Sequence, residues 1–129
     1  MKNVTRSIRF FTCISILVVL VYGCMSGPTD VTDQIKDANN ELMAAFAKGD
    51  TTALSGFYTS EAKIFPANNG IIDGQVSITK FWSGTIQMGI KKVLFETTTA
   101  QKIGSLAIEE GNYSLFLQGD QLVDQGKYI

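Results

Sequence analysis

The clearest pattern in the sequence is a stripe of apolar residues recurring at spacings of three and four. Its members are Val31, Ile35, Ala38, Leu42, Ala45 and Phe46. This spacing puts the side chains on one face of an α-helix. Asp30 or Thr29 is expected to cap its start, and Gly49 to end it, because glycine readily adopts the left-handed conformation found after helices. Asp50 then caps a second helix, predicted at residues 51–58.

The apolar positions that follow are typical of short strands, one further helix and long strands. The expected elements are strands at 63–65 and 71–72 around the turn Asn68-Asn69-Gly70, a helix at 75–82 ended by Ser83-Gly84, and strands at 91–99, 105–117 and 122–129. Two helices, a hairpin, a helix and three long strands predict an α+β domain. Its curved antiparallel sheet would pack on three N-terminal helices.

The first residues have the pattern of a targeting signal. Lys2, Arg6 and Arg9 precede an uncharged, mostly apolar run of 14 residues from Phe10 to Gly23, and Cys24 follows. A run this short matches the apolar region of a secretory signal better than a membrane-spanning helix. The sequence therefore predicts a signal peptide at 1–23, a tether at 24–29 and a domain at 30–129. An uncleaved signal anchor is the alternative.

Composition excludes several classes of site. The chain has no histidine, so it lacks the commonest general base and metal ligand, and we expect neither a metal nor a cofactor. Cleavage before Cys24 removes three of the 11 basic residues and leaves 8 against 12 acidic ones, a net charge of −4. An acidic domain without arginine is a poor candidate for binding nucleic acid. Cys24 would be its only cysteine, so no disulfide is expected.

Several segments together resemble the nuclear transport factor 2-like superfamily, and more narrowly its SnoaL-like, ketosteroid-isomerase-like members of the domain-of-unknown-function 4440 type. They are AFAKGD, FYTSEAKIFP, NNGIIDG, ITKFW, LAIEEGNYSL and DQGKYI, in that order from about Val31 to the end. The resemblance implies a cone-shaped sheet around an apolar cavity, and a homodimer. The segment before Cys24 similarly resembles the lipobox of bacterial lipoproteins, which implies lipid attachment at Cys24 and a place in the cell envelope.

The sequence departs from this superfamily at two points. Its members continue beyond the strand that here ends at Ile129, so we expect the sheet to lack its last strand in this sequence, as in a truncated chain. The positions of the ketosteroid isomerases' oxyanion-hole tyrosine and catalytic aspartate fall on Leu42 and Pro66. Proton abstraction of that kind would have no base here.

The remaining polar and aromatic residues suggest a cavity for a small apolar or amphipathic molecule. The candidate lining residues are Tyr58, Phe65, Trp82, Glu109, Tyr113 and Asp124, with Tyr128 as a further hydroxyl donor. Strand alternation puts one glutamate of the pair Glu109-Glu110 on the concave side of the sheet. A carboxylate of each strand, that glutamate and Asp124, could then meet there across the hairpin. Two other readings stay open: an isomerase or hydrolyase with Glu109 or Asp124 as base, and a module that dimerises through the outer sheet face.

Overall fold

The structure is a computed structural model, and it describes residues 27–67 and 69–129; Cys24 and the predicted signal peptide lie outside them. The elements follow the predicted order with one addition. They are β1 (Thr29–Asp30), α1 (Thr32–Lys48), α2 (Thr51–Gly56), β2 (Lys63–Ile64), β3 (Ile72–Asp73), α3 (Gln75–Gln87), β4 (Lys92–Ile103), β5 (Leu106–Phe116) and β6 (Leu122–Tyr128). The α+β prediction is confirmed.

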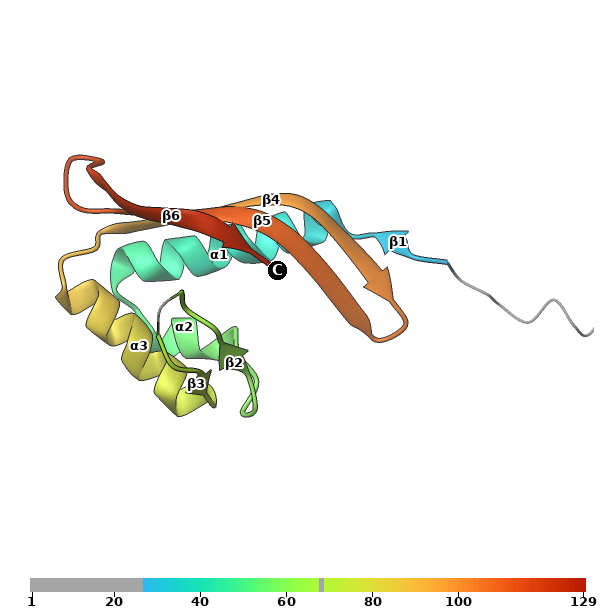
Figure 1. Cartoon of the computed structure of the whole chain (residues 1–129), viewed down its shortest axis with the longest axis horizontal. Helices are drawn as coiled ribbons and strands as arrows, with labels where there is room; N and C mark the ends of the chain where they lie inside the picture. Colours follow the sequence, from blue (N-terminus) through green and yellow to red (C-terminus); the bar gives the residue numbers. More distant parts are fainter. Residues whose placement is uncertain (1–26, 68) are drawn as a thin grey trace, which may run out of the picture.

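A curved antiparallel sheet of four strands, in the order β1-β4-β5-β6, forms one layer of the domain. Helix α1 lies along its inner face, and α2, α3 and the small β2–β3 hairpin lie on the far side of α1 from the sheet (Figure 1). The β4–β5 hairpin is the longest part of the sheet, and its distal half extends past the helices and curves toward the side on which they lie. A bulge between Thr97 and Thr99 interrupts the register of β4 with β5 at this bend.

The helix ends explain why the first two helices form where the sequence predicts them. Gly49 has a φ of 69°, so it provides the left-handed residue that ends α1. The Asp50 side chain accepts a hydrogen bond of 2.9 Å from the backbone N–H of Ala53 at the start of α2. Helix α3 differs from its prediction, because it continues through Ser83-Gly84 to Gln87. Burial of Thr85 in the tertiary structure outweighs the weak helix propensity of glycine.

The start of the domain also differs from the prediction. Thr29 and Asp30 form β1, which pairs with Lys102 and Gln101 of β4, and the residue preceding α1 is Val31. Asp30 still accepts a hydrogen bond of 2.8 Å from the backbone N–H of Thr32. Two residues are too few to show a strand pattern, so only the partner strand reveals β1.

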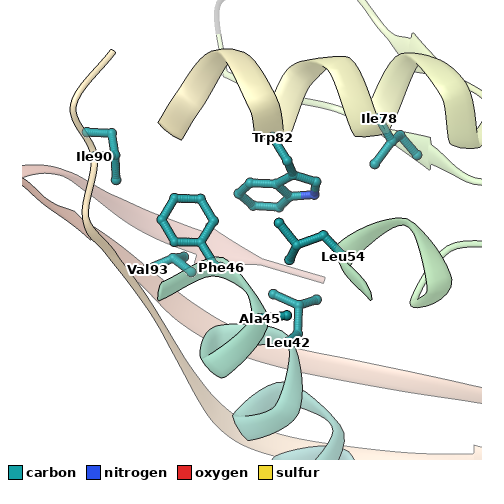
Figure 2. Close-up of a cluster of buried hydrophobic side chains, with 8 residues drawn as sticks. All are labelled: Leu42, Ala45, Phe46, Leu54, Ile78, Trp82, Ile90 and Val93. Atoms are coloured by element: carbon teal, nitrogen blue, oxygen red, sulfur yellow. The ribbon is translucent and has the colours of Figure 1, made fainter. Parts of the chain in front are cut away.

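The hydrophobic core fills the space between α1, α2, α3 and the first half of β4. It comprises Leu42, Ala45, Phe46, Leu54, Ile78, Trp82, Ile90 and Val93 (Figure 2). The Trp82 ring meets those of Phe46 and Phe81 edge to face, at centroid distances of 5.7 Å and 5.2 Å. Leu54 and Ile78 are completely buried. The amphipathic stripe of α1 therefore has the role that its spacing predicted.

Hairpin β2–β3 is small and exposed at its tip. Ile64 pairs with Ile72, and Lys63 forms an ion pair with Asp73 across the two strands. Phe65, just beyond β2, is 70% exposed. Within the described residues, none of the helices combines the length and hydropathy needed to cross a membrane.

Candidate functional site

Glu109 of β5 is the centre of a polar cluster on the inner face of the sheet. Its Oε1 atom accepts hydrogen bonds from the Tyr128 hydroxyl at 2.6 Å, the Thr97 hydroxyl at 2.7 Å and the Asn39 amide at 2.7 Å. The Asn39 amide also donates to the Thr97 hydroxyl at 3.1 Å. We call these four residues the Glu109 cluster. They come from α1, β4, β5 and β6, so the cluster fixes the helix against all three long strands.

The bulge in β4 and the alternation of β5 bring these side chains together. Thr97 lies opposite Gly111, and Ala100 lies opposite Glu109. The additional residue between Thr97 and Thr99 keeps Thr97 and Ala100, three positions apart, on the same inner face. Asn39 reaches the cluster because it lies on the side of α1 that faces the distal half of the sheet.

The same five-residue pattern occurs in both strands of the β5–β6 hairpin: an acid, any residue, Gly, any residue, Tyr. In β5 it is Glu109-x-Gly111-x-Tyr113, and in β6 it is Asp124-x-Gly126-x-Tyr128. The register pairs Gly111 with Tyr128 and Tyr113 with Gly126. Each tyrosine therefore crosses the glycine of the other strand and donates to the acid two residues before that glycine.

The contacts confirm that each glycine is needed for this arrangement. A Cβ atom at Gly111 would lie 2.5 Å from the Tyr128 hydroxyl and 2.7 Å from the backbone oxygen of Glu96. A Cβ atom at Gly126 would lie 2.7 Å from the Tyr113 ring. The Tyr128 ring also meets Phe95 edge to face at 5.4 Å, which gives the Glu109 cluster an aromatic border.

Burial is the main cause that raises the pKa of the Tyr128 hydroxyl above its ordinary value of 10.0, and the hydrogen bond to Glu109 adds to it. Burial likewise raises the pKa of Tyr58 and of Tyr113. For Tyr128, burial and the hydrogen bond to Glu109 both favour the neutral phenol. Tyr128 is therefore a hydrogen-bond donor throughout the physiological pH range.

These shifts predict a loss of stability in alkaline solution. The unfolded chain releases its tyrosine protons near pH 10, whereas the folded protein keeps that of Tyr128 to higher pH. The free energy of unfolding should therefore fall as the pH rises above about 10. Urea unfolding between about pH 8 and pH 11 measures this decline. Tyr128→Phe should show a shallower decline, and identical slopes for the two proteins would contradict the prediction.

The second acid of the repeated pattern lies at the other end of the hairpin. Asp124 accepts a hydrogen bond of 3.1 Å from the Tyr113 hydroxyl and is exposed. The register puts Asp124 opposite Leu115, six residues along β5 from Glu109 and thus roughly 20 Å away. The expectation that the two carboxylates meet is therefore wrong, although both are on the inner face.

The other predicted lining residues are separated from the Glu109 cluster in different ways. Trp82 is 6% exposed and belongs to the core, where its indole N–H donates to the Tyr58 hydroxyl at 3.0 Å. Phe65 lies on the surface near β2. Two open depressions of about 340 Å³ and 320 Å³ lie at the start of α1 and between α1 and α2, and neither contains Glu109. The role of the lining residues in binding stays a prediction.

Sequence reasoning did not include Asn39 and Thr97. Both are single polar residues in amphipathic segments, and nothing in their spacing predicts a common partner. The repeated acid-x-Gly-x-Tyr pattern, by contrast, is visible in the sequence, but only the register of β5 with β6 shows that Tyr128 reaches Glu109. Among residues 27–67 and 69–129 there is no group of three histidine, cysteine, aspartate or glutamate side chains placed to hold a metal ion.

Comparison with known proteins relates the chain to others through its fold. No protein-family model and no curated protein matches the sequence. A solved structure from Streptomyces avermitilis, a dehydratase candidate of the NTF2-like family, matches with a TM-score of 0.51 and 15% identity, over 74% of this chain and 77% of that one. An uncharacterised cystatin-fold protein from Novosphingobium aromaticivorans matches with a TM-score of 0.50 and 14% identity, over 70% and 80%.

A third similar structure is a SnoaL-like polyketide cyclase candidate from Shewanella denitrificans, with a TM-score of 0.47 and 18% identity, over 72% of this chain and 71% of that one. At 14–15% identity, the two matches with TM-scores of 0.50 and 0.51 show a similar fold and do not show a shared chemistry. The described chain has an α+β fold similar to that of the NTF2-like family, with three helices and a curved antiparallel sheet of four strands.

Proposed function

We propose that this protein is a lipoprotein of the bacterial cell envelope whose domain binds a small amphipathic molecule on the inner face of the sheet. The Glu109 cluster is the observation that supports binding. All three hydrogen bonds to the carboxylate fall on Oε1. Oε2 accepts none from the described residues and remains available for a donor group of the ligand. The rings of Phe95 and Tyr128 then contact its apolar part.

The proposed membrane attachment rests on the sequence. Lipid attachment at Cys24 is supported by the basic start of the sequence, the apolar run and the lipobox-like segment before this cysteine. Stable anchoring to a membrane needs two acyl chains on the protein. The motifs that carry the resemblance support a closer relationship. We further propose that this protein is a SnoaL-like member of the nuclear transport factor 2-like superfamily, of the domain-of-unknown-function 4440 type. We also propose that it forms a homodimer.

Catalysis is the second candidate, with Glu109 as the base of an isomerase or hydrolyase. Its support is a carboxylate held in a fixed orientation on the inner face. The three donors on Oε1 weaken this candidate, because they already occupy one of the two oxygen atoms with which the carboxylate could take up a proton. Asp124 is exposed, with the hydroxyl of Tyr113 beside it. Binding without chemical conversion is therefore the function that the geometry supports best.

A thermal-shift screen with steroids, fatty acids and polyketide-like compounds tests the binding proposal. A ligand at a hundred-fold excess over its Kd adds about 2.7 kcal/mol to the stability of the folded state. For a domain of this size the melting temperature should rise by roughly 10 °C or more. Glu109→Gln should remove most of this rise, because the amide replaces one acceptor oxygen with a donor.

Asp124→Asn is the matched control, since it changes an acid on the same face about 20 Å away. The control should keep the full rise in melting temperature. Failure of every compound to stabilise the wild-type protein would contradict the proposal. If Glu109→Gln and Asp124→Asn lost the ligand-induced rise in melting temperature to the same extent, the binding site would not be at Glu109.

A further inference from the structure

We propose that the distal end of the β4–β5 hairpin rests on the surface of the lipid bilayer. This end carries three large apolar side chains that are at least half exposed: Ile103 at 53%, Leu106 at 71% and Ile108 at 50%. We call them the hairpin-tip residues. The inference rests on the proposed membrane attachment and adds to it the surface of the domain that faces the lipid.

The hairpin-tip residues share one face of the hairpin. Ile103 lies directly opposite Leu106, and residues opposite each other in an antiparallel pair point to the same side. Ile108 follows Leu106 by two positions and so points to that side as well. Because Glu109 faces inward, this is the outer face of the sheet. The tip thus presents a continuous apolar surface to its surroundings.

The path of the chain indicates what covers this surface. Strand β1 pairs Thr29 with Lys102, the residue next to Ile103. The chain therefore enters the domain at the hairpin tip, and β1 and the tip lie at the same end of the molecule (Figure 1). Cys24 precedes Thr29 by five residues, which span at most about 18 Å. Both a lipid on Cys24 and a signal anchor would thus hold this end close to the membrane.

The charges of the hairpin end also suit a lipid surface. Residues 101–108 contain one charged side chain, Lys102, and no acid, although acids outnumber lysines in the domain as a whole. Lys102 points to the face of the hairpin opposite Ile103. If the tip lies in the headgroup region, the long lysine side chain can place its ammonium group beside the lipid phosphates. Exposed apolar side chains without acidic neighbours favour entry into the boundary between headgroups and acyl chains, because membrane binding strengthens with the apolar area that is buried there.

Fluorescence quenching by lipid tests the inference with a matched pair of variants. Leu106→Trp and Met88→Trp place an indole at two sites whose native side chains are exposed to nearly the same extent, 71% and 73%. Met88 directly follows Gln87, the last residue of α3. That end of α3 lies at the end of the molecule opposite the β4–β5 hairpin tip (Figure 1). Each full-length protein, purified from membranes, is reconstituted into phosphatidylcholine vesicles with and without bromine on the acyl chains. The emission of the wild-type protein, from its single tryptophan, is subtracted.

Brominated lipid should remove most of the added emission of Leu106→Trp and little of that of Met88→Trp. Equal emission from Leu106→Trp in both lipids, in protein that floats with the vesicles, would overturn the inference and leave the attachment intact. Equal quenching at both sites would also overturn the inference. Emission from Leu106→Trp that is shifted to shorter wavelength but not quenched would overturn it too, because it would indicate that a second copy of the protein covers the tip. Protein that does not float would overturn the membrane attachment, and this inference with it.

Discussion

Replacing Trp82 with alanine is expected to lower the free energy of unfolding by about 3–5 kcal/mol. The indole is 6% exposed and contacts the rings of Phe46 and Phe81, so its removal leaves a cavity between α1 and α3. It also removes the N–H that donates to the Tyr58 hydroxyl. Domains are commonly stable by only about 5–15 kcal/mol, so a large part of the total would be lost. Urea unfolding followed by circular dichroism measures the change.

Two further variants separate the cavity from the hydrogen bond. Trp82→Phe keeps an aromatic ring and loses the N–H, and we expect a cost of about 1–2 kcal/mol. Val76→Ala, at a side chain 70% exposed at the start of the same helix, should change stability by less than about 0.5 kcal/mol. A Trp82→Ala cost no larger than that of Val76→Ala would show that the core does not depend on this ring.

Gly111→Ala is expected to lower the free energy of unfolding by about 2–3 kcal/mol and to disturb the Glu109 cluster. The new methyl group would lie 2.5 Å from the Tyr128 hydroxyl and 2.7 Å from the Glu96 carbonyl oxygen. The tyrosine ring can rotate away, but the carbonyl belongs to the paired strand β4 and cannot move without breaking the register. Urea unfolding gives the cost, and the tyrosine ultraviolet spectrum reports the displacement of Tyr128.

Gly126→Ala is the matched control, because it is the corresponding glycine of the other strand. The three atoms nearest to its methyl group all belong to the Tyr113 side chain, so rotation of that side chain relieves the closest contacts. We expect a cost of about 1 kcal/mol. In the background Tyr128→Ala, Gly111→Ala should remain costly because the Glu96 carbonyl is still there. A lower cost for Gly111→Ala than for Gly126→Ala would contradict this explanation.

Helices and turns were predictable where local spacing or a special backbone conformation determines them. The stripe from Val31 to Phe46 predicted α1 and its buried face, and Gly49 and Asp50 predicted the break between the first two helices. Gly104, with a φ of 63°, likewise provides the turn between β4 and β5. Elements that depend on partners were missed or shortened: β1 exists only because β4 is beside it, and α3 continues because Thr85 is buried.

The candidate site shows the same division. Strand alternation grouped Glu109 with Gly111 and Tyr113 on one face of β5, and the hydrogen bond from Asn39 of α1 shows that this is the inner face. Alternation did not reveal the hydrogen bonds from Asn39 and Thr97, because one lies on a helix 70 residues away and the other is positioned by a bulge. The expected meeting of Glu109 with Asp124 was wrong for a related reason. Alternation determines the face of a strand on which a residue lies, whereas the register determines how far apart two residues are.

The sequence by itself determined the order of the elements after β1, the amphipathic faces, the α+β class and the repeated acid-x-Gly-x-Tyr pattern, because these depend on residues close together in the chain. The tertiary structure alone decided that Tyr128 crosses Gly111 to reach Glu109, that Trp82 belongs to the core, and that the chain enters beside the β4–β5 hairpin tip. Each of these depends on strand register and on packing between distant segments, which the spacing of residues does not encode.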